Sequence, residues 1–150
     1  MSRARADRLW VWGQILLIAL VVVAASIGPH WPARLILFIV GVVAAAAGGL
    51  AMLWGGRTLG PLLTPYPSPR GKHLERGPYG FVRHPIYGGG IILALGVSLA
   101  SSPWALVPTA ALIPFFLIKS RYEERLLAQA DPSYAEYLTR VRKRFFPGLL

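Results

Sequence analysis

Three long uncharged segments limit what this chain of 150 residues can fold into more than any other feature of its sequence. Residues 9–28, 35–54 and 86–118 contain no Asp, Glu, Lys or Arg. A helix needs about 20 apolar residues to cross a hydrocarbon core roughly 30 Å thick, so the first two segments each predict a membrane-spanning helix. A secretory signal peptide is the alternative for residues 9–28, but its apolar part would be only about 7–15 residues long, and a retained helix is favoured.

The third segment is too long for a single crossing. At 1.5 Å per residue, a helix over residues 86–118 would be about 50 Å long. Residues 101–104 (Ser-Ser-Pro-Trp) lie at its middle and are typical of a turn, which predicts a helical hairpin; a re-entrant pair of helices is the alternative. We therefore expect an all-α polytopic membrane protein with about four membrane-embedded helices, the last two forming the hairpin.

The distribution of basic residues predicts the orientation of these helices. The formal net charge is +10, and all but one of the 16 Lys and Arg residues lie before residue 9, between residues 57 and 85, or after residue 118. With four crossings these parts share one side of the membrane, and the positive-inside rule places that side, with both termini, in the cytoplasm. A bacterial inner membrane is the expected location. A nucleic-acid-binding protein would need a soluble basic face with aromatic platforms, so no nucleic acid is expected as a partner.

Other classes of site are excluded or disfavoured by what the chain lacks. Cysteine is absent, which excludes disulfides, thiolate metal ligands and a cysteine nucleophile. The three histidines, at positions 30, 73 and 84, lack the spacing of a metal site, and no bound metal is predicted. A transporter or channel would usually place ionisable groups within its spans, whereas these segments are uncharged.

The remaining segments complete a single membrane domain, residues 1–150. The proline-rich residues 57–85 form a cytoplasmic loop whose length suggests a function. The region 119–150 is polar, and its Asp131-Pro132 pair is typical of a helix start. Beyond that pair, apolar residues recur at three- and four-residue spacings between Arg and Lys. This pattern predicts an amphipathic helix over residues 133–146 at the membrane interface.

Polar residues gathered on one face of so small a bundle are candidates for a functional site. One cluster is residues 77–90 (GPYGFVRHPIYGGG) and the other is residues 119–125 (KSRYEER). The first leads into the predicted hairpin and the second leaves it. Because a hairpin returns to its starting side, we expect the two clusters to meet at the cytoplasmic interface.

The motifs in these clusters resemble those of the isoprenylcysteine carboxyl methyltransferase and phospholipid methyltransferase group of integral membrane enzymes. The resemblance covers residues 72–150, about half of the chain. It is carried by Gly77-Pro78-Tyr79, Val82-Arg83-His84-Pro85-Ile86-Tyr87, Gly88, Gly90, Glu123-Glu124, and a later pattern that includes Tyr134, Tyr137, Arg140 and Val141. The RHP-x-Y motif followed by a Glu pair after an apolar hairpin is more specific than either motif alone.

The resemblance implies methyl transfer from S-adenosylmethionine to a lipophilic or membrane-associated acceptor, with S-adenosylhomocysteine as the product. It implies that Arg83 and Glu124 are catalytic. The cofactor-binding residues that it implies are His84, Pro85, Tyr87, Gly88, Gly90, Glu123 and Glu124. The guanidinium of Arg83 matches the cofactor's carboxylate or an acidic acceptor, and a carboxylate of the glutamate pair matches the cofactor's ammonium or ribose hydroxyls. Adjacent helical residues face different directions, so the two glutamates are expected to have different roles.

Several alternatives stay open at this point. The acceptor is a carboxylate, as in isoprenylcysteine carboxyl methyltransferases, or an amine or thiol, as in phospholipid N-methyltransferases or small-thiol methyltransferases. A membrane scaffold or sensor that retains the fold without activity is the non-enzymatic alternative. Structural roles are also open: Arg83 as an anchor on lipid phosphate, the Glu pair in ion pairs with neighbouring bases, and Gly88 and Gly90 as helix-packing residues.

Overall fold

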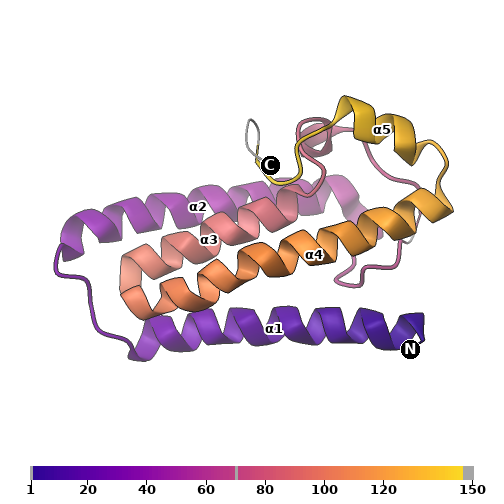
Figure 1. The fold of residues 1–150 in the computed structure, drawn as a ribbon. Coiled ribbons are helices and arrows are strands. Elements are labelled where there is room, and N and C mark those ends of the chain that lie inside the picture. The colour runs from indigo at the N-terminus through magenta and orange to yellow at the C-terminus, as the bar shows by residue number, and fades with distance from the viewer. Residues whose placement is uncertain (1, 70, 147–150) are drawn as a thin grey trace.

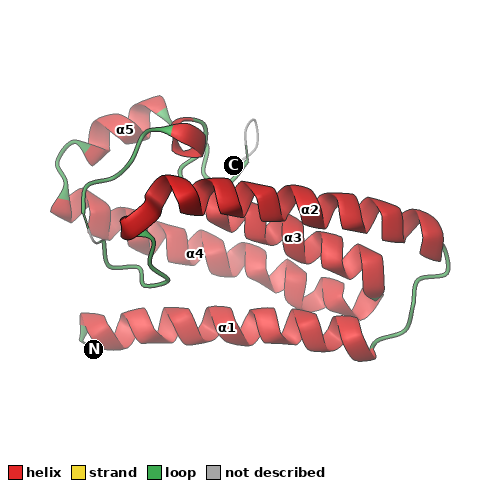
Figure 2. Ribbon diagram, turned by 180° about the vertical axis from the view of Figure 1, so that it is seen from behind, coloured by secondary structure: helices red, strands yellow, loops and turns green. Residues whose placement is uncertain are grey.

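The computed structural model describes residues 2–69 and 71–146, and no strand occurs in that part of the chain. Its helices lie side by side in the order α1, α4, α3 and α2, with the short α5 at one end (Figure 1), and the reverse view shows the same order (Figure 2). The helices are α1 (Arg3–Ile27), α2 (Arg34–Leu59), α3 (Pro85–Ser101), α4 (Leu106–Ala130) and α5 (Tyr134–Arg140), with 3-10 turns at Gly60–Leu62, Gly77–Gly80 and Pro103–Ala105.

Three of these helices are long and apolar enough to cross a membrane. They are α1 (Arg3–Ile27), α2 with the turn that follows it (Arg34–Leu62), and α4 with the turn that precedes it (Pro103–Ala130). The helix α3, Pro85–Ser101, is apolar but shorter. The outer faces of α1 and α2 expose large apolar side chains such as Trp12 and Val43, as surfaces in contact with lipid do. The predicted all-α membrane protein with a C-terminal helical hairpin is thus confirmed.

Two helices extend beyond the predicted spans. α1 begins six residues before the uncharged segment and includes all three N-terminal arginines. α2 continues through Gly55-Gly56-Arg57, which were expected to end it. Gly55 is buried, and a Cβ there would contact the side chain of Ile86 at the start of α3, so packing keeps this turn helical. The helix ends instead at Gly60, whose φ of 55° is a left-handed conformation that glycine adopts without strain.

Glycine residues bring the backbones of α2 and α3 into contact. A methyl group added to Gly48 would meet the backbone of Leu93 and the carbonyl oxygen of Gly89. One added to Gly41 would meet the backbone of α3 in the same way, one heptad earlier. Gly49, by contrast, has no atom within 4 Å of such a methyl group. Small residues allow this close approach in lipid, where apolar side chains gain nothing by leaving an equally apolar solvent.

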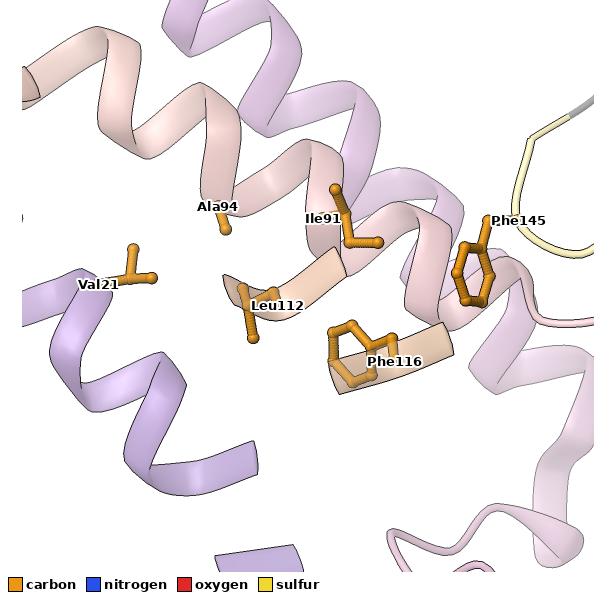
Figure 3. Packing of buried hydrophobic residues seen from close by; sticks show 6 residues of the cluster. All are labelled: Val21, Ile91, Ala94, Leu112, Phe116 and Phe145. Atoms are coloured by element: carbon orange, nitrogen blue, oxygen red, sulfur yellow. The ribbon is translucent and has the colours of Figure 1, made fainter. Parts of the chain in front are cut away.

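The buried core lies between α1, α3, α4 and the segment that follows α5. Figure 3 shows its members from these four parts of the chain: Val21, Ile91, Ala94, Leu112, Phe116 and Phe145. Leu112 is only 1% exposed and Phe145 only 3%. Phe145 thus attaches the C-terminal segment to the hairpin.

The C-terminal helix is shorter than predicted. α5 ends at Arg140, whereas the pattern predicted helix to residue 146. The backbone leaves the helix after Arg140, and the carbonyl groups of Lys143 and Arg144 accept hydrogen bonds from the N–H groups of Arg83 and His84, in a segment distant in the sequence. The apolar face of α5 is buried within the protein, since Tyr134 and Tyr137 are 1% and 2% exposed. Residues 147–150 of the expected C-terminal region lie outside the described residues.

One end of the bundle gathers the polar parts of the chain. The N-terminus, the loop after α2 and α5 all lie there, and the connections after α1 and α3 lie at the opposite end (Figure 1). We refer to the end that contains the N-terminus, the loop of residues 63–84 and α5 as the polar end.

Candidate active site

The two polar clusters of the sequence lie together at the polar end. α3 starts there at Pro85, and α4 carries Glu123 and Glu124 in its C-terminal half. The nitrogen atoms of His84 contact both glutamates across this junction. The two clusters are therefore in contact, as the predicted hairpin required.

The backbone before α3 is held by the C-terminal segment. The N–H groups of Arg83 and His84 donate to the carbonyl oxygens of Lys143 and Arg144 at 3.0 and 2.8 Å. Pro85 occupies the first turn of α3, where its missing N–H leaves no helical bond unmade. The C-terminal segment and the start of α3 thus fix the backbone from which the side chains of Arg83 and His84 extend.

Glu124 is the centre of a buried charged cluster. Arg144 donates to both of its carboxylate oxygens, at 3.1 and 2.7 Å. Arg83 Nε lies 3.4 Å and His84 Nε2 lies 3.1 Å from Glu124 Oε1. Only 9% of Glu124 is exposed, so these contacts saturate a carboxylate that water barely reaches. A carboxylate with such partners fixes the side chains around it.

Glu123 has different partners from its neighbour. The Tyr87 hydroxyl donates to Glu123 Oε1, and His84 Nδ1 lies 3.6 Å from Glu123 Oε2. The rings of His84 and Tyr87 are stacked with centroids 5.4 Å apart, and Tyr87 stacks on Phe116 at 4.5 Å. His84 therefore bridges the two glutamates, while Glu123 lies beside an aromatic stack.

A cavity of about 420 Å³ opens beside Glu123. Its wall includes Gln14 of α1, the end of α2, the loop after α2, the start of α3 and part of α4. In the part of the chain that the structure describes, the basic and acidic side chains on the wall are Lys72, His73, Arg83, His84, Lys119 and Glu123, and the apolar wall residues include Leu59, Leu62, Leu63, Ile86 and Leu127. Pockets for small organic ligands are of this size, with mostly apolar walls and a few placed polar groups.

The predicted site residues divide into two groups around this cavity. Arg83, His84, Tyr87 and Glu123 line it, whereas Glu124 lies behind Arg83 and His84. Pro85, Gly88 and Gly90 are not on the wall either. A methyl group on Gly88 would meet the carbonyl oxygen of Phe145, and one on Gly90 would lie 3.8 Å from Met52 Sδ. Gly88 is therefore packed against the backbone of the C-terminal segment, whereas Gly90 has room for a methyl group.

Among the contacts of the loop over the cavity, three bind it to α1, to α4 and to the residue that follows α4. The Ser68 hydroxyl donates to Asp7 Oδ2 of α1 at 2.5 Å. Lys119 Nζ donates to the carbonyl oxygen of Pro65 at 3.0 Å. His73 Nδ1 lies 2.8 Å from Asp131 Oδ2, immediately after α4. The loop is thus an ordered wall of the cavity, and α1 and α4 set its position.

His73, interpreted from the sequence only as a loop residue, lies between two carboxylates. Its Nε2 is 2.9 Å from Glu75 Oε1, opposite the contact with Asp131. Hydrogen bonds from the Ser133 hydroxyl and from His73 lower the pKa of Asp131 from its ordinary value of 3.8 to about 2. Hydrogen bonds from Arg140 and His73 also lower the pKa of Glu75. Both carboxylates are therefore ionised at neutral pH and hold the loop against α5.

Lys119 is a second wall residue that the sequence analysis did not single out. It is fully buried, and its Nζ donates to Gln14 Oε1 at 2.7 Å as well as to Pro65. The sequence carries one signal for it: Lys119 is the first charged residue after the uncharged residues 86–118. Within a helix that continues through this point, such a lysine lies near the apolar region rather than in water.

Comparison with known proteins adds to this geometry. Residues 36–131, which include most of α2, all of α3 and α4 and both polar clusters, match the phospholipid methyltransferase family. Over 122 residues, 79% of this chain, the sequence is 33% identical to the cobalt-zinc-cadmium resistance protein CzcN of Cupriavidus metallidurans. The chain spans about half of that protein's length, 51%.

Proposed function

Because the chain belongs to the phospholipid methyltransferase family, part of the isoprenylcysteine carboxyl methyltransferase-like group, we propose that it transfers a methyl group from S-adenosylmethionine to a lipophilic acceptor. The family itself supports membrane methyltransferase activity. One observation carries the finer proposal: Arg83, His84, Tyr87 and Glu123, which come from clusters more than 30 residues apart, meet on the wall of one cavity.

The wall residues match the chemical groups of this cofactor. Glu123 offers a carboxylate for its ammonium or its ribose hydroxyls. Arg83 offers a planar guanidinium, the group best suited to a carboxylate. Tyr87 and His84 add aromatic rings, and leucine residues of the loop and α2 add an apolar surface for adenine. The donor set therefore fits the cofactor.

The protein's contribution to the reaction is mainly one of position and environment. When bound, S-adenosylmethionine supplies a methyl group on a positively charged sulfur. The acceptor must lie in line with the bond that breaks, and holding two reactants in that geometry provides much of the rate. Glu124 acts through the residues that it holds, since it contacts Arg83 and His84 but not the cavity. For an amine acceptor, His84 or Glu123 is placed to take the proton.

The arrangement of charge supports a cytoplasmic site. The N-terminal arginines, the loop of residues 63–84 and α5 all belong to the polar end (Figure 1). The positive-inside rule places that end in the cytoplasm of a multi-pass protein, and we propose a bacterial inner membrane. The cofactor would then arrive from water, and the acceptor would arrive laterally from the bilayer.

Calorimetric titration of S-adenosylhomocysteine into protein in lipid nanodiscs tests this function. We expect saturable binding by the wild type and at least tenfold weaker binding by Glu123→Gln, which removes a charge from the cavity wall. Glu136→Gln is the matched control, because the side chain of Glu136 is 79% exposed and lies outside the cavity. A folded wild type that binds no S-adenosylhomocysteine would contradict the proposal.

The same preparation separates the remaining alternatives. Labelled S-adenosylmethionine with carboxylate, amine and thiol amphiphiles would distinguish an isoprenylcysteine carboxyl methyltransferase-like enzyme from a phospholipid N-methyltransferase or a small-thiol methyltransferase. A scaffold or sensor that merely keeps the fold predicts that Glu123→Gln and Arg83→Ala fold normally and change no ligand binding.

A further inference from the structure

Lys119 is a buried lysine whose ammonium group is hydrogen-bonded to uncharged protein atoms. Its side chain is fully buried, and it lies on the cavity wall. Both of its hydrogen-bond acceptors, Gln14 Oε1 and the carbonyl oxygen of Pro65, are uncharged. Its third neighbour is the face of the Tyr87 ring, with Nζ 5.2 Å from the centroid. Amide oxygens and an aromatic face are the surroundings of an ammonium group.

None of the ion pairs among residues 2–69 and 71–146 includes Lys119. Among the described residues, Glu123 is the acidic residue of the cavity wall, and its carboxylate contacts Tyr87 and His84. A buried charge is costly unless a countercharge accompanies it. An ammonium has three donors, and hydrogen bonds to Gln14 and Pro65 account for two of them.

We propose that Lys119 is the charge-selecting residue of the cavity: its ammonium binds an anionic acceptor group and excludes a cationic amine. This inference rests on the proposed function and names the acceptor class for the same site. Lys72 and Arg83 also line the cavity, so positive charge dominates its wall. Arg83 already contacts Glu124, and Lys72 is exposed. Among the described residues, Lys119 is therefore the buried cation of the wall that forms no ion pair, and the carboxylates of Glu123 and Asp7 act on it only at longer range.

An anionic acceptor also simplifies the reaction. A lone pair of the carboxylate or thiolate forms the new bond to the methyl carbon, and the carbon–sulfur bond breaks with its electron pair going to sulfur. The negative charge of the acceptor and the positive charge of the sulfonium are both lost, and no proton needs to be removed. A cavity poor in water favours such charge neutralisation. Lys119 would hold the acceptor before transfer and release the neutral product.

Ligand binding in nanodiscs of zwitterionic lipid tests this selection without turnover. Octanoate, octanol and octylamine are titrated at pH 8 by calorimetry, with empty nanodiscs subtracted. We expect the wild type to bind octanoate about tenfold more tightly than octanol, the factor for one charge-assisted hydrogen bond, and octylamine more weakly than either. Equal binding of octanoate and octanol, or a preference for octylamine as expected if Lys119 were a neutral base, would overturn the proposal.

Substitutions on and beside the cavity wall test whether Lys119 causes the preference for octanoate. Lys119→Gln should abolish the preference for octanoate, whereas Lys119→Arg should keep it. Lys72→Gln is the matched control, because it removes an exposed lysine from the same cavity wall. Gln14→Leu removes a structural partner of Lys119 but not its charge, and it should also keep the preference. If Lys119→Gln keeps the preference, or if Gln14→Leu loses it as completely as Lys119→Gln does, the assignment is wrong.

A final arm separates the acceptor from the cofactor as the source of the anion. Octanoate should still bind when S-adenosylhomocysteine is saturating. Mutually exclusive binding would place the carboxylate of the cofactor on Lys119 and would overturn the acceptor assignment. Normal S-adenosylhomocysteine binding without selection for octanoate would leave the methyltransferase proposal intact, whereas octanoate selection without S-adenosylhomocysteine binding would contradict that proposal alone.

Discussion

The contact between α2 and α3 and the polar end around Glu124 are built in opposite ways. In the first, glycines such as Gly48 and Gly89 bring two backbones together with almost no side chain between them. In the second, Arg83, His84 and Arg144, which come from two other parts of the chain, converge on the single carboxylate of Glu124. The first region consists of apolar membrane helix, and the second of helix ends and connecting segments.

The difference follows from what surrounds each region. In lipid, burying an apolar side chain gains little, so close packing of backbones supplies the attraction between helices. At the polar end, segments that are not helical must be held, and charge-assisted hydrogen bonds hold them with defined geometry. We therefore expect added side-chain atoms to destabilise the contact between α2 and α3, and the loss of a charge to destabilise the polar end.

Gly48→Leu should have the largest effect. Its side chain would push against the backbone of α3, so we expect the free energy of unfolding to fall by more than about 3 kcal/mol, or the protein to lose its monodisperse state. Circular dichroism during heating and size-exclusion chromatography measure this. The control is Gly49→Leu, which adds the same side chain one position along, where nothing lies within 4 Å, and should cost less than about 1 kcal/mol. Equal effects of the two variants would contradict the packing described here.

Glu124→Gln comes next and addresses the polar end. Removing this charge leaves Arg144 and Arg83 buried without their partner, with an expected cost of about 3 kcal/mol in thermal or denaturant unfolding. Glu136→Gln, at a side chain 79% exposed, should change stability by less than about 0.5 kcal/mol. If Glu124→Gln is equally neutral, the cluster does not hold the C-terminal segment.

The ionised carboxylate of Asp131 should have a smaller effect on stability, and this effect should depend on pH. Its pKa is lower in the folded protein, so the folded state favours its ionised form. That stabilisation is fully present above the ordinary value of 3.8 and is lost as the pH falls toward about 2. The melting temperature of the wild type should therefore drop more between pH 5 and pH 2.5 than that of Asp131→Asn, which should melt earlier at pH 5. Parallel profiles for the two proteins would show that the contacts of Asp131 do not stabilise the fold.

The weakest effect is expected for Arg140→Gln. Arg140 pairs with Glu75 at 2.5 Å, but the two side chains are 53% and 41% exposed. Solvent screens such a pair, so the loss should not exceed about 0.5 kcal/mol in the same unfolding assay. A loss as large as that of Glu124→Gln would show that exposure does not distinguish the two ion pairs.

Much of the fold follows from the sequence because membrane helices are determined by local composition. The uncharged segments and the turn at residues 101–104 were sufficient to predict the hairpin. The length of α5 could not be predicted in this way, because the carbonyl groups of Lys143 and Arg144 bind backbone N–H groups from a distant segment. Local periodicity contains no information about such a partner.

The candidate site shows the same division. Arg83, His84, Tyr87 and Glu123 lie in short motifs whose residue types suggest chemistry, and the structure places them on one cavity. Gly88 and Gly90 belong to the same motif, but their packing against Phe145 and Met52 depends on neighbours that the motif does not reveal. For Lys119, its position at the end of an uncharged segment indicates a place near the apolar region, but it does not reveal the partners from α1 and the loop that surround its ammonium.

The backbone pairing of residues 83 and 84 with residues 143 and 144 has a consequence for biogenesis. A ribosome makes α1 to α4 before it makes the segment that holds Arg83 and His84. The hydrophobic helices are therefore available for insertion while this half of the pocket still lacks its support. Maturation of the pocket becomes a late event, separate in time from integration into the bilayer. Synthesis of residues 143 and 144, rather than membrane insertion, would then complete this side of the pocket.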